Sequence, residues 1–322
     1  MTRRRVFGRL GWQVSEVGFG TWGMGGWSGA DDAEAHAALD RAVALGCNFF
    51  DTAIAYGAGK SEQMVGEMLR RHHGTQLYVA TKVPPKNLKW PGRASTPASE
   101  AFPADHIRAS TETSLRNLGV ERIDLQQLHV WSDAWTGDDG WRREAERLKA
   151  EGKIGGFGIS VNRWEPANVL RAIETGLVDS VQVVYNVLDQ APEDVLFPAC
   201  RARGVAVIAR VPFDEGSLTG GLRAGVAWPE GDWRNTYFTP DALSATLARV
   251  DALTRDLPDE LSLPSAALRF ILANEDVATV IPGMRQVRHV DANLAASAAG
   301  PLEPALVATL RKHRWDRSYE VE

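Results

Sequence analysis

The amino-acid sequence predicts an α/β fold: a (β/α)8 TIM barrel with an N-terminal β-hairpin and long loops at the C-terminal face. Eight short apolar runs alternate with amphipathic helical patterns, as in a parallel sheet buried on both faces. Most runs begin roughly 25–31 residues after the last one, about the length of one βα unit. A barrel takes about 250 residues, so the 322 residues leave room for a hairpin and insertions. We expect one domain over residues 1–322.

Each expected element has its own local signal. Alternating apolar residues on both sides of residues 8–11 predict the hairpin within residues 3–17. The expected strands lie at 17–22, 47–53, 78–83, 123–130, 154–161, 180–187, 205–212 and 278–283. Helical periodicity is found at 32–45, 61–71, 104–118, 140–151, 165–175, 193–203, from 240 onward and at 264–274. Ser61 is the expected N-cap of the helix at 61–71.

The longest stretches without periodicity each follow an expected strand. They cover residues 84–103, 131–139 and 213–239. Loops after the strands of such a barrel lie at its C-terminal face, where the active sites of this fold are built. We therefore expect the functional site at this face.

Composition excludes several classes of function. The net charge of −5 gives no basic surface for nucleic acid. No apolar run reaches the roughly 18 residues that a membrane-spanning helix needs, and the basic start lacks the apolar region of a signal peptide. Cys47 and Cys200 lie in apolar surroundings far apart in the sequence, which indicates reduced core residues and no metal site. We expect a cytoplasmic protein without nucleic-acid or membrane partners.

A glycine motif near the N-terminus is not a dinucleotide fingerprint. Gly18, Gly20 and Gly23 satisfy G-x-G-x-x-G, but residues 25–27 (Gly-Gly-Trp) follow in place of a helix. The fingerprint requires an acidic residue about 20 residues on. The next acid at a strand end, Asp51, comes 28 residues after Gly23. A Rossmann fold is therefore disfavoured.

Reactive side chains follow consecutive expected strands. Asp51 ends the second strand and Tyr56 follows it, Lys82 ends the third, and His129 ends the fourth. A single polar residue at a strand end is commonly an ordinary cap, but four of suitable type at one rim favour catalysis. Lysine beside a phenol is expected to lower the phenol pKa from about 10, and histidine can polarise a carbonyl oxygen. Such a group can protonate an oxygen as hydride reaches its carbon.

Several motifs together resemble the aldo-keto reductase family over nearly the full length. They are VGFGTW, FFDTAIAYGAGKSE, VATKV, DLQQLHVW, FGIS, VQVVYN and VIPGMR. The resemblance implies a nicotinamide cofactor without metal, a small-molecule carbonyl substrate and reversible carbonyl–alcohol interconversion. It also implies that Tyr56 is the general acid of a tetrad completed by Asp51, Lys82 and His129.

The resemblance further implies a set of cofactor-binding residues. Ser160 and Gln182 match the side chains that hold the nicotinamide carboxamide. The family often has Ser-Asn after the fifth strand, and here Asn162 is displaced by one position. The other positions in this set are Gly20, Thr21, Trp22 and Asp51 beside the nicotinamide, Val211, Pro212, Phe213, Gly216 and Leu218 in the pyrophosphate loop, and Gly283, Arg285, His289 and Asn293 at the adenosine.

Two arginines bear on the choice and state of the cofactor. Arg285 is placed for a 2′-phosphate, which favours NADPH over NADH, although the family more often has glutamine where His289 stands. Arg210 occupies the position of an aromatic ring that commonly stacks on the nicotinamide. Either its guanidinium stacks there, or it forms a salt bridge to Asp214 or Glu215.

Aromatic residues are expected around the mouth of the barrel and favour apolar or ring substrates. Trp22, Trp90 and Trp131 are the expected substrate-pocket residues, and the other candidates are Trp27, Trp135 and Phe213. The sequence carries no signal for the physiological substrate or the oligomeric state. An alternative to the reductase is a cofactor-binding, redox-sensing subunit with little turnover, since some members of the family are channel subunits.

Overall fold

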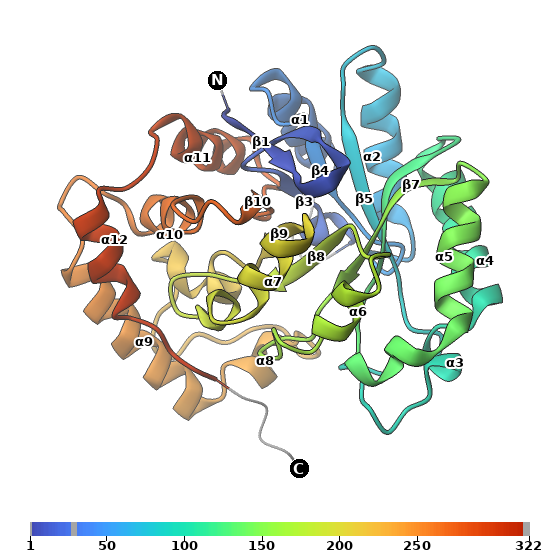
Figure 1. Ribbon diagram of the computed structural model, residues 1–322. Helices are drawn as coiled ribbons and strands as arrows, with labels where there is room; N and C mark the ends of the chain where they lie inside the picture. The colour runs from blue at the N-terminus through green and yellow to red at the C-terminus, as the bar shows by residue number, and fades with distance from the viewer. Residues whose placement is uncertain (1, 27–30, 318–322) are drawn as a thin grey trace.

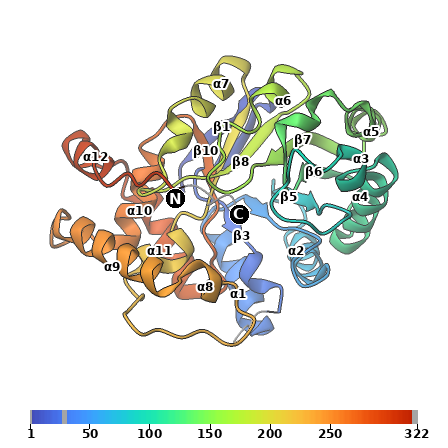
Figure 2. The ribbon, with the colours of Figure 1, turned by 90° about the horizontal axis from the view of Figure 1, so that it is seen from below.

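A computed structural model describes residues 2–26 and 31–317. Its central sheet has eight parallel strands in the order β10-β9-β8-β7-β6-β5-β4-β3, and the helices surround it (Figures 1 and 2). The strands are β3 (Phe19–Gly20), β4 (Phe49–Asp51), β5 (Tyr78–Val83), β6 (Ile123–Leu128), β7 (Ile154–Ser160), β8 (Ser180–Val184), β9 (Ala206–Arg210) and β10 (Val277–Val280). Each expected strand is present, though most are shorter than predicted.

The sheet closes where its first and last strands meet. Val17 forms a parallel bridge with Val280, and Gly20 forms one with Gly283. The amide of Gly20 donates to the carbonyl of Pro282 at 2.9 Å. A Cβ at Gly20 would lie 2.7 Å from the carbonyl oxygen of Ile281, so glycine allows this close approach. The predicted (β/α)8 barrel is thus confirmed.

Most predicted helices are present at nearly the predicted bounds. They are α1 (Asp32–Ala44), α2 (Lys60–Arg71), α4 (Ala104–Leu118), α5 (Asp139–Ala150), α7 (Leu196–Arg203), α9 (Pro240–Arg255) and α10 (Leu263–Leu272). The prediction missed two short helices, α3 (Ala98–Ala101) and α8 (Arg234–Tyr237), and two longer ones, α11 (Val287–Ala298) and α12 (Pro304–Arg311).

The predicted helix at 165–175 is wrong in its first half, because α6 covers only Leu170–Glu174. Trp164 has φ 58°, outside the right-handed helical region. Side chains then hold the backbone in an irregular loop: Asn168 accepts from the amide of Asp133 at 2.7 Å and donates to the carboxylate of Glu165 at 2.8 Å. These local hydrogen bonds compete with the helical ladder.

The hairpin, β1 (Arg4–Phe7) paired with β2 (Trp12–Ser15), covers the N-terminal end of the barrel. Phe7 packs with residues from the barrel interior. Arg5 donates to the carbonyls of Asn274 at 2.9 Å and Val277 at 2.8 Å, and to the carboxylate of Glu16 at 2.9 Å. Since this end is sealed, the residues at the opposite end form the accessible mouth.

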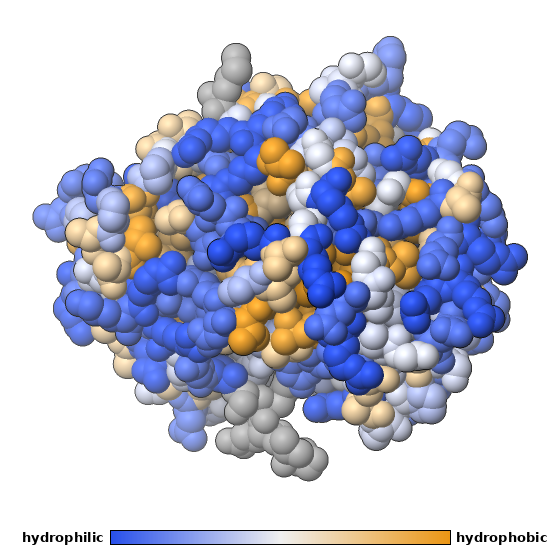
Figure 3. All heavy atoms as spheres, in the orientation of Figure 1, coloured by the Kyte–Doolittle hydropathy of each residue, from blue (hydrophilic) through white to orange (hydrophobic). Residues whose placement is uncertain are grey.

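The face shown in Figure 3 is largely hydrophilic, with apolar residues in small groups. Within residues 2–26 and 31–317, no helix has both the length and the apolar character needed to cross a bilayer.

We expect Arg5→Ala to lower the free energy of unfolding by about 1–3 kcal/mol, because it removes the guanidinium that pairs with the buried carboxylate of Glu16 and donates to the carbonyls of Leu272, Asn274 and Val277. The exposed Arg4, which donates only to the carbonyl of Gln13 among the described residues, provides the matched control. Arg4→Ala should change stability by less than about 0.5 kcal/mol. Denaturant titrations of both variants measure the difference, and equal effects would contradict this account of the hairpin.

Candidate active site

A buried ion pair lies at the centre of the barrel mouth. Lys82 Nζ is 2.5 Å from Asp51 Oδ1, 2.8 Å from the carbonyl of Thr52 and 3.3 Å from the hydroxyl of Tyr56. The Lys82 side chain is fully buried and Asp51 nearly so. The geometry follows from the sheet, because β4 and β5 are parallel neighbours and their ends meet at one rim. A line of polar atoms therefore runs from the carboxylate through the ammonium to the phenol.

The second oxygen of Asp51 is held by two amides. Gln182 Nε2 donates to Asp51 Oδ2 at 2.8 Å, and Gln127 Nε2 lies 3.3 Å from the same oxygen. The sequence interpretation gave Gln127 no role. A signal for it existed: by strand alternation, Leu125 and Gln127 of β6 share one face, and the same alternation continued past the strand reaches His129.

Burial determines the proton affinity of the phenol. Burial raises the pKa of Tyr56 above its usual value, and the positive charge of Lys82 opposes this without reversing it. The expectation of a lowered pKa is therefore wrong for this structure, because loss of solvent around the phenolate outweighs one neighbouring cation. Burial works against the ammonium of Lys82, yet Asp51 and Tyr56 raise its pKa. Near neutral pH the tyrosine is protonated and the lysine charged.

His129 lies beside the phenol at the edge of the mouth. Its ring is 5.7 Å from that of Tyr56 and 4.7 Å from that of Trp90, both edge-on. Burial, then the charges of Lys82 and Arg210, hold its pKa well below the usual value. The imidazole is therefore neutral at physiological pH and can offer one N–H donor.

Close backbone contacts fix the loop that carries Tyr56. Gly57 has φ 62°, and a Cβ there would lie 2.4 Å from the carbonyl oxygen of Gly25. The prediction that Ser61 caps α2 is wrong, because the N-cap is Gly59. The Ser61 hydroxyl is instead 2.6 Å from the Thr21 hydroxyl and 2.9 Å from that of Thr52. Ser61 thus links the loops after β3 and β4 below the phenol.

A cavity of about 1140 Å³ lies above the ion pair. Its volume exceeds the range typical of drug-sized ligands, roughly 300–1,000 Å³. Most residues predicted from the sequence line it: Gly20, Thr21, Trp22, Asp51, Tyr56, Trp90, His129, Ser160, Asn162, Gln182, Arg210, Val211, Pro212, Phe213, Gly216, Gly283, Arg285 and His289. The sequence interpretation did not assign Arg163, Glu215 or Asp232 to the lining, because they lie on loops without a periodic signal.

A few predicted residues lie outside this lining. Leu218 packs in the hydrophobic core, and Asn293 lies on the buried face of α11. Trp131 is fully buried against Trp135 and Trp141, with ring centroids 5.7 and 5.0 Å away. Trp131 and Trp135 are therefore wrong as pocket residues: they form the wall below the mouth. Trp27 lies outside the described residues.

Asn162 uses its amide group within the protein. Its Nδ2 donates to the carbonyl of Gly92 at 2.9 Å and to the carboxylate of Glu165 at 2.8 Å, and its Oδ1 accepts from the amide of Gly92 at 3.1 Å. The side chain thus joins the loop after β5 to the loop after β7. A carboxamide contact would have to compete with these bonds.

Arg210 ends β9 and extends towards the end of β7. Its Nη2 donates to the carbonyl of Val161 at 3.0 Å, and its side chain borders the cavity. Of the two acids considered as salt-bridge partners, Glu215 pairs with Arg163, and Asp214 pairs with Arg317 at 2.8 Å. Burial raises the pKa of Glu215 to about 7, and the charges of Arg163 and Arg210 oppose that rise. This geometry is compatible with a guanidinium directed at a bound ring.

A cationic group lies at the N-terminal end of α11, at the far side of the cavity. Arg285 and His289 line the cavity, and Arg288 Nε is 3.4 Å from His289 Nε2. Within the described part of the chain, neither arginine forms an ion pair with an acidic side chain. Burial and these two arginines lower the pKa of His289. The group is suited to binding an anion.

A closed parallel barrel with reactive side chains at the C-terminal ends of its strands is typical of an enzyme. The aldo/keto reductase family model matches residues 16–314. Pyridoxal 4-dehydrogenase of Microbacterium luteolum is 29% identical, with 91% of this chain and 92% of the relative aligned. NADH-specific methylglyoxal reductase of Escherichia coli is 28% identical, with 88% and 90% aligned.

A solved structure gives the same result. The holo form of aldo-keto reductase AKR11C1 from Bacillus halodurans has a TM-score of 0.78 to this chain at 29% identity, with 99% of each chain covered. The chain belongs to the aldo-keto reductase family. It is therefore an NAD(P)H-dependent oxidoreductase that acts on small carbonyl compounds.

We expect Trp90, which lines the cavity, and Trp131, which is buried below it, to differ in their effects on substrate binding and on stability. Trp90→Ala should raise KM for an aromatic aldehyde at least about fivefold, the equivalent of about 1 kcal/mol of lost apolar contact. Trp131→Phe should leave KM within about twofold but lower the free energy of unfolding by about 1–3 kcal/mol. Steady-state kinetics and chemical denaturation measure both. A raised KM in Trp131→Phe would return that residue to the pocket.

Proposed function

We propose that the protein is an NADPH-dependent reductase of aldehydes or ketones, with Tyr56 as the general acid and Lys82, Asp51 and His129 in support. The observation that carries this proposal is the Asp51–Lys82–Tyr56 line, which is buried below and opens into the cavity above. The proposed catalytic unit is one domain over residues 1–322. The two buried free cysteines suit a cytoplasmic location.

The tetrad residues would deliver a proton to the substrate oxygen. When bound, a reduced nicotinamide supplies the hydride for the carbonyl carbon. The phenol of Tyr56 is protonated near neutral pH and can donate its proton to the developing alkoxide. Lys82 stabilises the resulting phenolate, and Asp51 keeps the lysine charged and in place. Neutral His129 can donate a hydrogen bond to the same oxygen and orient it.

The residues around the cavity fit a dinucleotide. Ser160 ends β7 and Gln182 lies within the neighbouring strand β8, in direct register with it, where the two side chains can hold the carboxamide. Thr21 and Trp22 border the same region, and the loop after β9 contributes Val211, Pro212, Phe213 and Gly216. The cationic group of Arg285, Arg288 and His289 lies at the other end of the cavity, away from Ser160 and Gln182. We assign the adenosine to Gly283, Arg285 and His289. Asn293, on the buried face of α11, and Leu218, in the core under the loop after β9, would support the site from outside the cavity lining.

NADPH is the proposed cofactor because of the cations at the start of α11. Only NADPH carries a 2′-phosphate, and an arginine fork matches phosphate geometry. The relative from E. coli is described as NADH-specific, so membership of the family leaves the choice open. The preference therefore depends on Arg285 in this chain.

Arg210 is the proposed neighbour of the nicotinamide ring. The reduced ring is neutral, whereas the oxidised ring is positively charged. Two unit charges about 4 Å apart repel by roughly 1–4 kcal/mol between water and a surface-like dielectric. Arg210 would accordingly weaken the binding of NADP⁺ relative to NADPH and favour reduction over alcohol oxidation.

We expect Tyr56→Phe to reduce turnover by at least roughly 10²–10⁴-fold, because the ring remains but the proton donor is lost. NADPH binding should persist in fluorescence titration. Tyr78→Phe is the matched control, since Tyr78 begins β5 at the other end of the barrel and stacks on Trp12. Retention of more than about a tenth of the activity by Tyr56→Phe would place the proton donor elsewhere. Absence of NADPH oxidation by the wild-type protein with a panel of generic aldehydes would favour the redox-sensing alternative.

We expect Arg285→Ala to weaken NADPH binding by roughly 10–150-fold, about 1.5–3 kcal/mol, with little effect on NADH. The reason is the loss of a charge-assisted contact to the 2′-phosphate. Arg288→Ala, outside the cavity lining, should have a smaller effect. Both dissociation constants are measurable by fluorescence titration, and equal losses for the two cofactors would remove Arg285 from this role.

A further inference from the structure

The loop after β9 has an unusual backbone. Val211, Asp214 and Glu215 have φ of 56°, 43° and 56°, in the left-handed region that side chains other than glycine rarely adopt. Gly216 follows at φ 104°. Conformations of this kind persist only where surrounding contacts hold them. Residues of this loop border the cavity, so the contacts that hold it also shape the site.

Asp214 is the point at which the loop is held. Its side chain is buried, and it accepts hydrogen bonds from the Tyr237 hydroxyl at 2.6 Å, the Ser217 hydroxyl at 2.7 Å and Arg317 Nη2 at 2.8 Å. Ser217 belongs to the loop itself, and Tyr237 belongs to α8. Arg317 is the single cationic donor among these contacts, and it lies about a hundred residues further along the chain.

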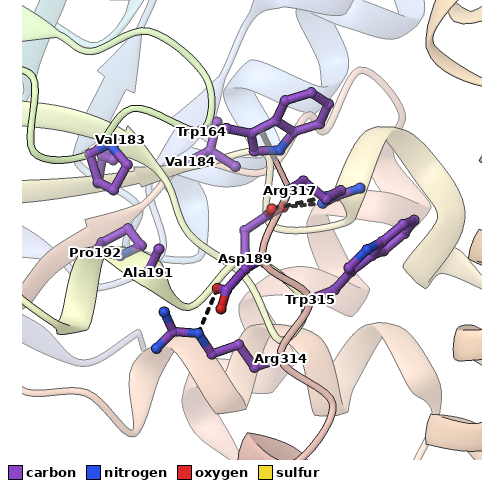
Figure 4. A pocket seen from close by; sticks show the side chains of 11 residues that line it. Trp164, Val183, Val184, Asp189, Ala191, Pro192, Arg314, Trp315 and Arg317 are labelled. Carbon is purple, nitrogen blue, oxygen red and sulfur yellow. Dashed lines mark hydrogen bonds and ion pairs between the residues drawn. The ribbon is translucent and has the colours of Figure 1, made fainter. Parts of the chain in front are cut away.

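Arg317 connects this loop to a second one. Its Nε donates to Asp189 Oδ1 at 3.1 Å, and its Nη2 pairs with the other oxygen of that carboxylate, as Figure 4 shows. Asp189 lies in the loop after β8 and accepts from Asn186 Nδ2 at 3.0 Å. The same nitrogen of Asn186 is 3.1 Å from the carbonyl of Val211. Two of the three left-handed residues are therefore tied into this network.

The arginine is enclosed and not a surface contact. Its side chain is 8% exposed, and its guanidinium lies 5.3 Å from the ring of Trp164 and 4.7 Å from that of Trp315. Figure 4 shows these groups around a small cavity of about 180 Å³ behind the mouth. Arg314, on the same segment, instead pairs with Asp194 and Asp316 at 2.6 and 2.7 Å near the surface.

We propose that Arg317 is a positioning residue for the nicotinamide cofactor: by holding Asp214 it keeps residues 211–219 in the conformation that closes on the pyrophosphate. The inference rests on the proposed function, which assigns this loop to the cofactor. Arg317 itself does not border the main cavity. Its effect passes through Asp214 to the neighbouring residues Phe213, Glu215 and Gly216, which do.

Both the positive charge and the planar guanidinium of Arg317 matter at this position. It faces two buried carboxylates, Asp189 and Asp214, and a bidentate guanidinium can bond to both at once. A lysine keeps the charge but has no planar fork. Alanine leaves both acids buried without their cation, so the loop is free to relax towards ordinary backbone angles.

The experiment compares Arg317→Ala and Arg317→Lys with the control Arg314→Ala, using full-length protein and NADPH as the probe. Fluorescence titration gives Kd, and stopped-flow displacement gives the dissociation rate. We expect Arg317→Ala to raise Kd at least about tenfold, the equivalent of 1.4 kcal/mol, chiefly through faster dissociation. Arg317→Lys should recover part of the affinity, and Arg314→Ala should remain within about twofold of wild type.

A double-mutant cycle separates positioning from general destabilisation. Asp214→Asn alone should weaken NADPH binding, and adding Arg317→Ala to it should raise Kd by clearly less than the tenfold expected in the wild-type background, because the Arg317–Asp214 contact is already weakened. Additive losses would overturn the proposal, as would an Arg317→Ala variant that binds NADPH like the wild type. If Arg317→Ala does not fold, Asp214→Asn and Arg317→Lys carry the same comparison.

The outcomes also distinguish this inference from the function on which it rests. If the wild-type protein binds neither NADPH nor NADH, both the proposed function and the proposed role of Arg317 are wrong. A wild-type protein that binds NADPH, with an unchanged Arg317→Ala variant, would remove only the role of Arg317. At saturating NADPH, KM for the carbonyl substrate should be unaffected in Arg317→Ala; a raised KM would show that the arginine acts on the substrate site instead.

Discussion

The buried ion pair between Asp51 and Lys82 is the constraint on which the rest of the mouth depends. Removing two charges from water is costly, and their attraction compensates only when the remaining hydrogen-bonding atoms are also satisfied. Here the Thr52 carbonyl accepts from the ammonium, and Gln182 donates to the carboxylate. The pair and these partners lie on β4 and the residue after it, on β5 and on β8, so the pair is satisfied only when the sheet curves enough to bring β8 close to β4. The ion pair at the mouth therefore depends on the curvature of the barrel sheet.

The strand ends were predictable from sequence because strand alternation and parallel order fix them. Asp51, Lys82 and His129 follow apolar runs, and a barrel must bring those ends to one rim. Local chemistry was harder to predict. Ser61 has the residue type of an N-cap, yet its hydroxyl binds Thr21, forty positions away in the sequence. Trp131 has the residue type expected of a substrate pocket, yet it is fully buried and packs against Trp135 and Trp141.

The direction of the Tyr56 pKa shift was also not predictable from the sequence. A neighbouring lysine can be inferred from the order of strands, but the depth of burial cannot, and burial has the larger effect here. The backbone conformation of the loops after β7 and β9 was not predictable either, because residues other than glycine adopt positive φ there. Glycine marks a left-handed turn at Gly57, whereas Asp214 and Glu215 adopt such angles without any marker in the sequence. Contacts from distant segments, which no local pattern reports, hold them there.

The seam of the barrel has a consequence for how the chain is made. The Thr279 hydroxyl donates to the carbonyl of Ser15, 264 positions earlier, and Val17 bridges Val280 beside it. During synthesis from the N-terminus, β3 therefore has one partner strand and an exposed edge until β10 has been translated. Unpaired edges of this kind are sites of aggregation in folding intermediates. Ribosome-bound chains that end before β10 should accordingly expose this edge, and closing the barrel requires pairing of segments far apart in the sequence, which is intrinsically slow.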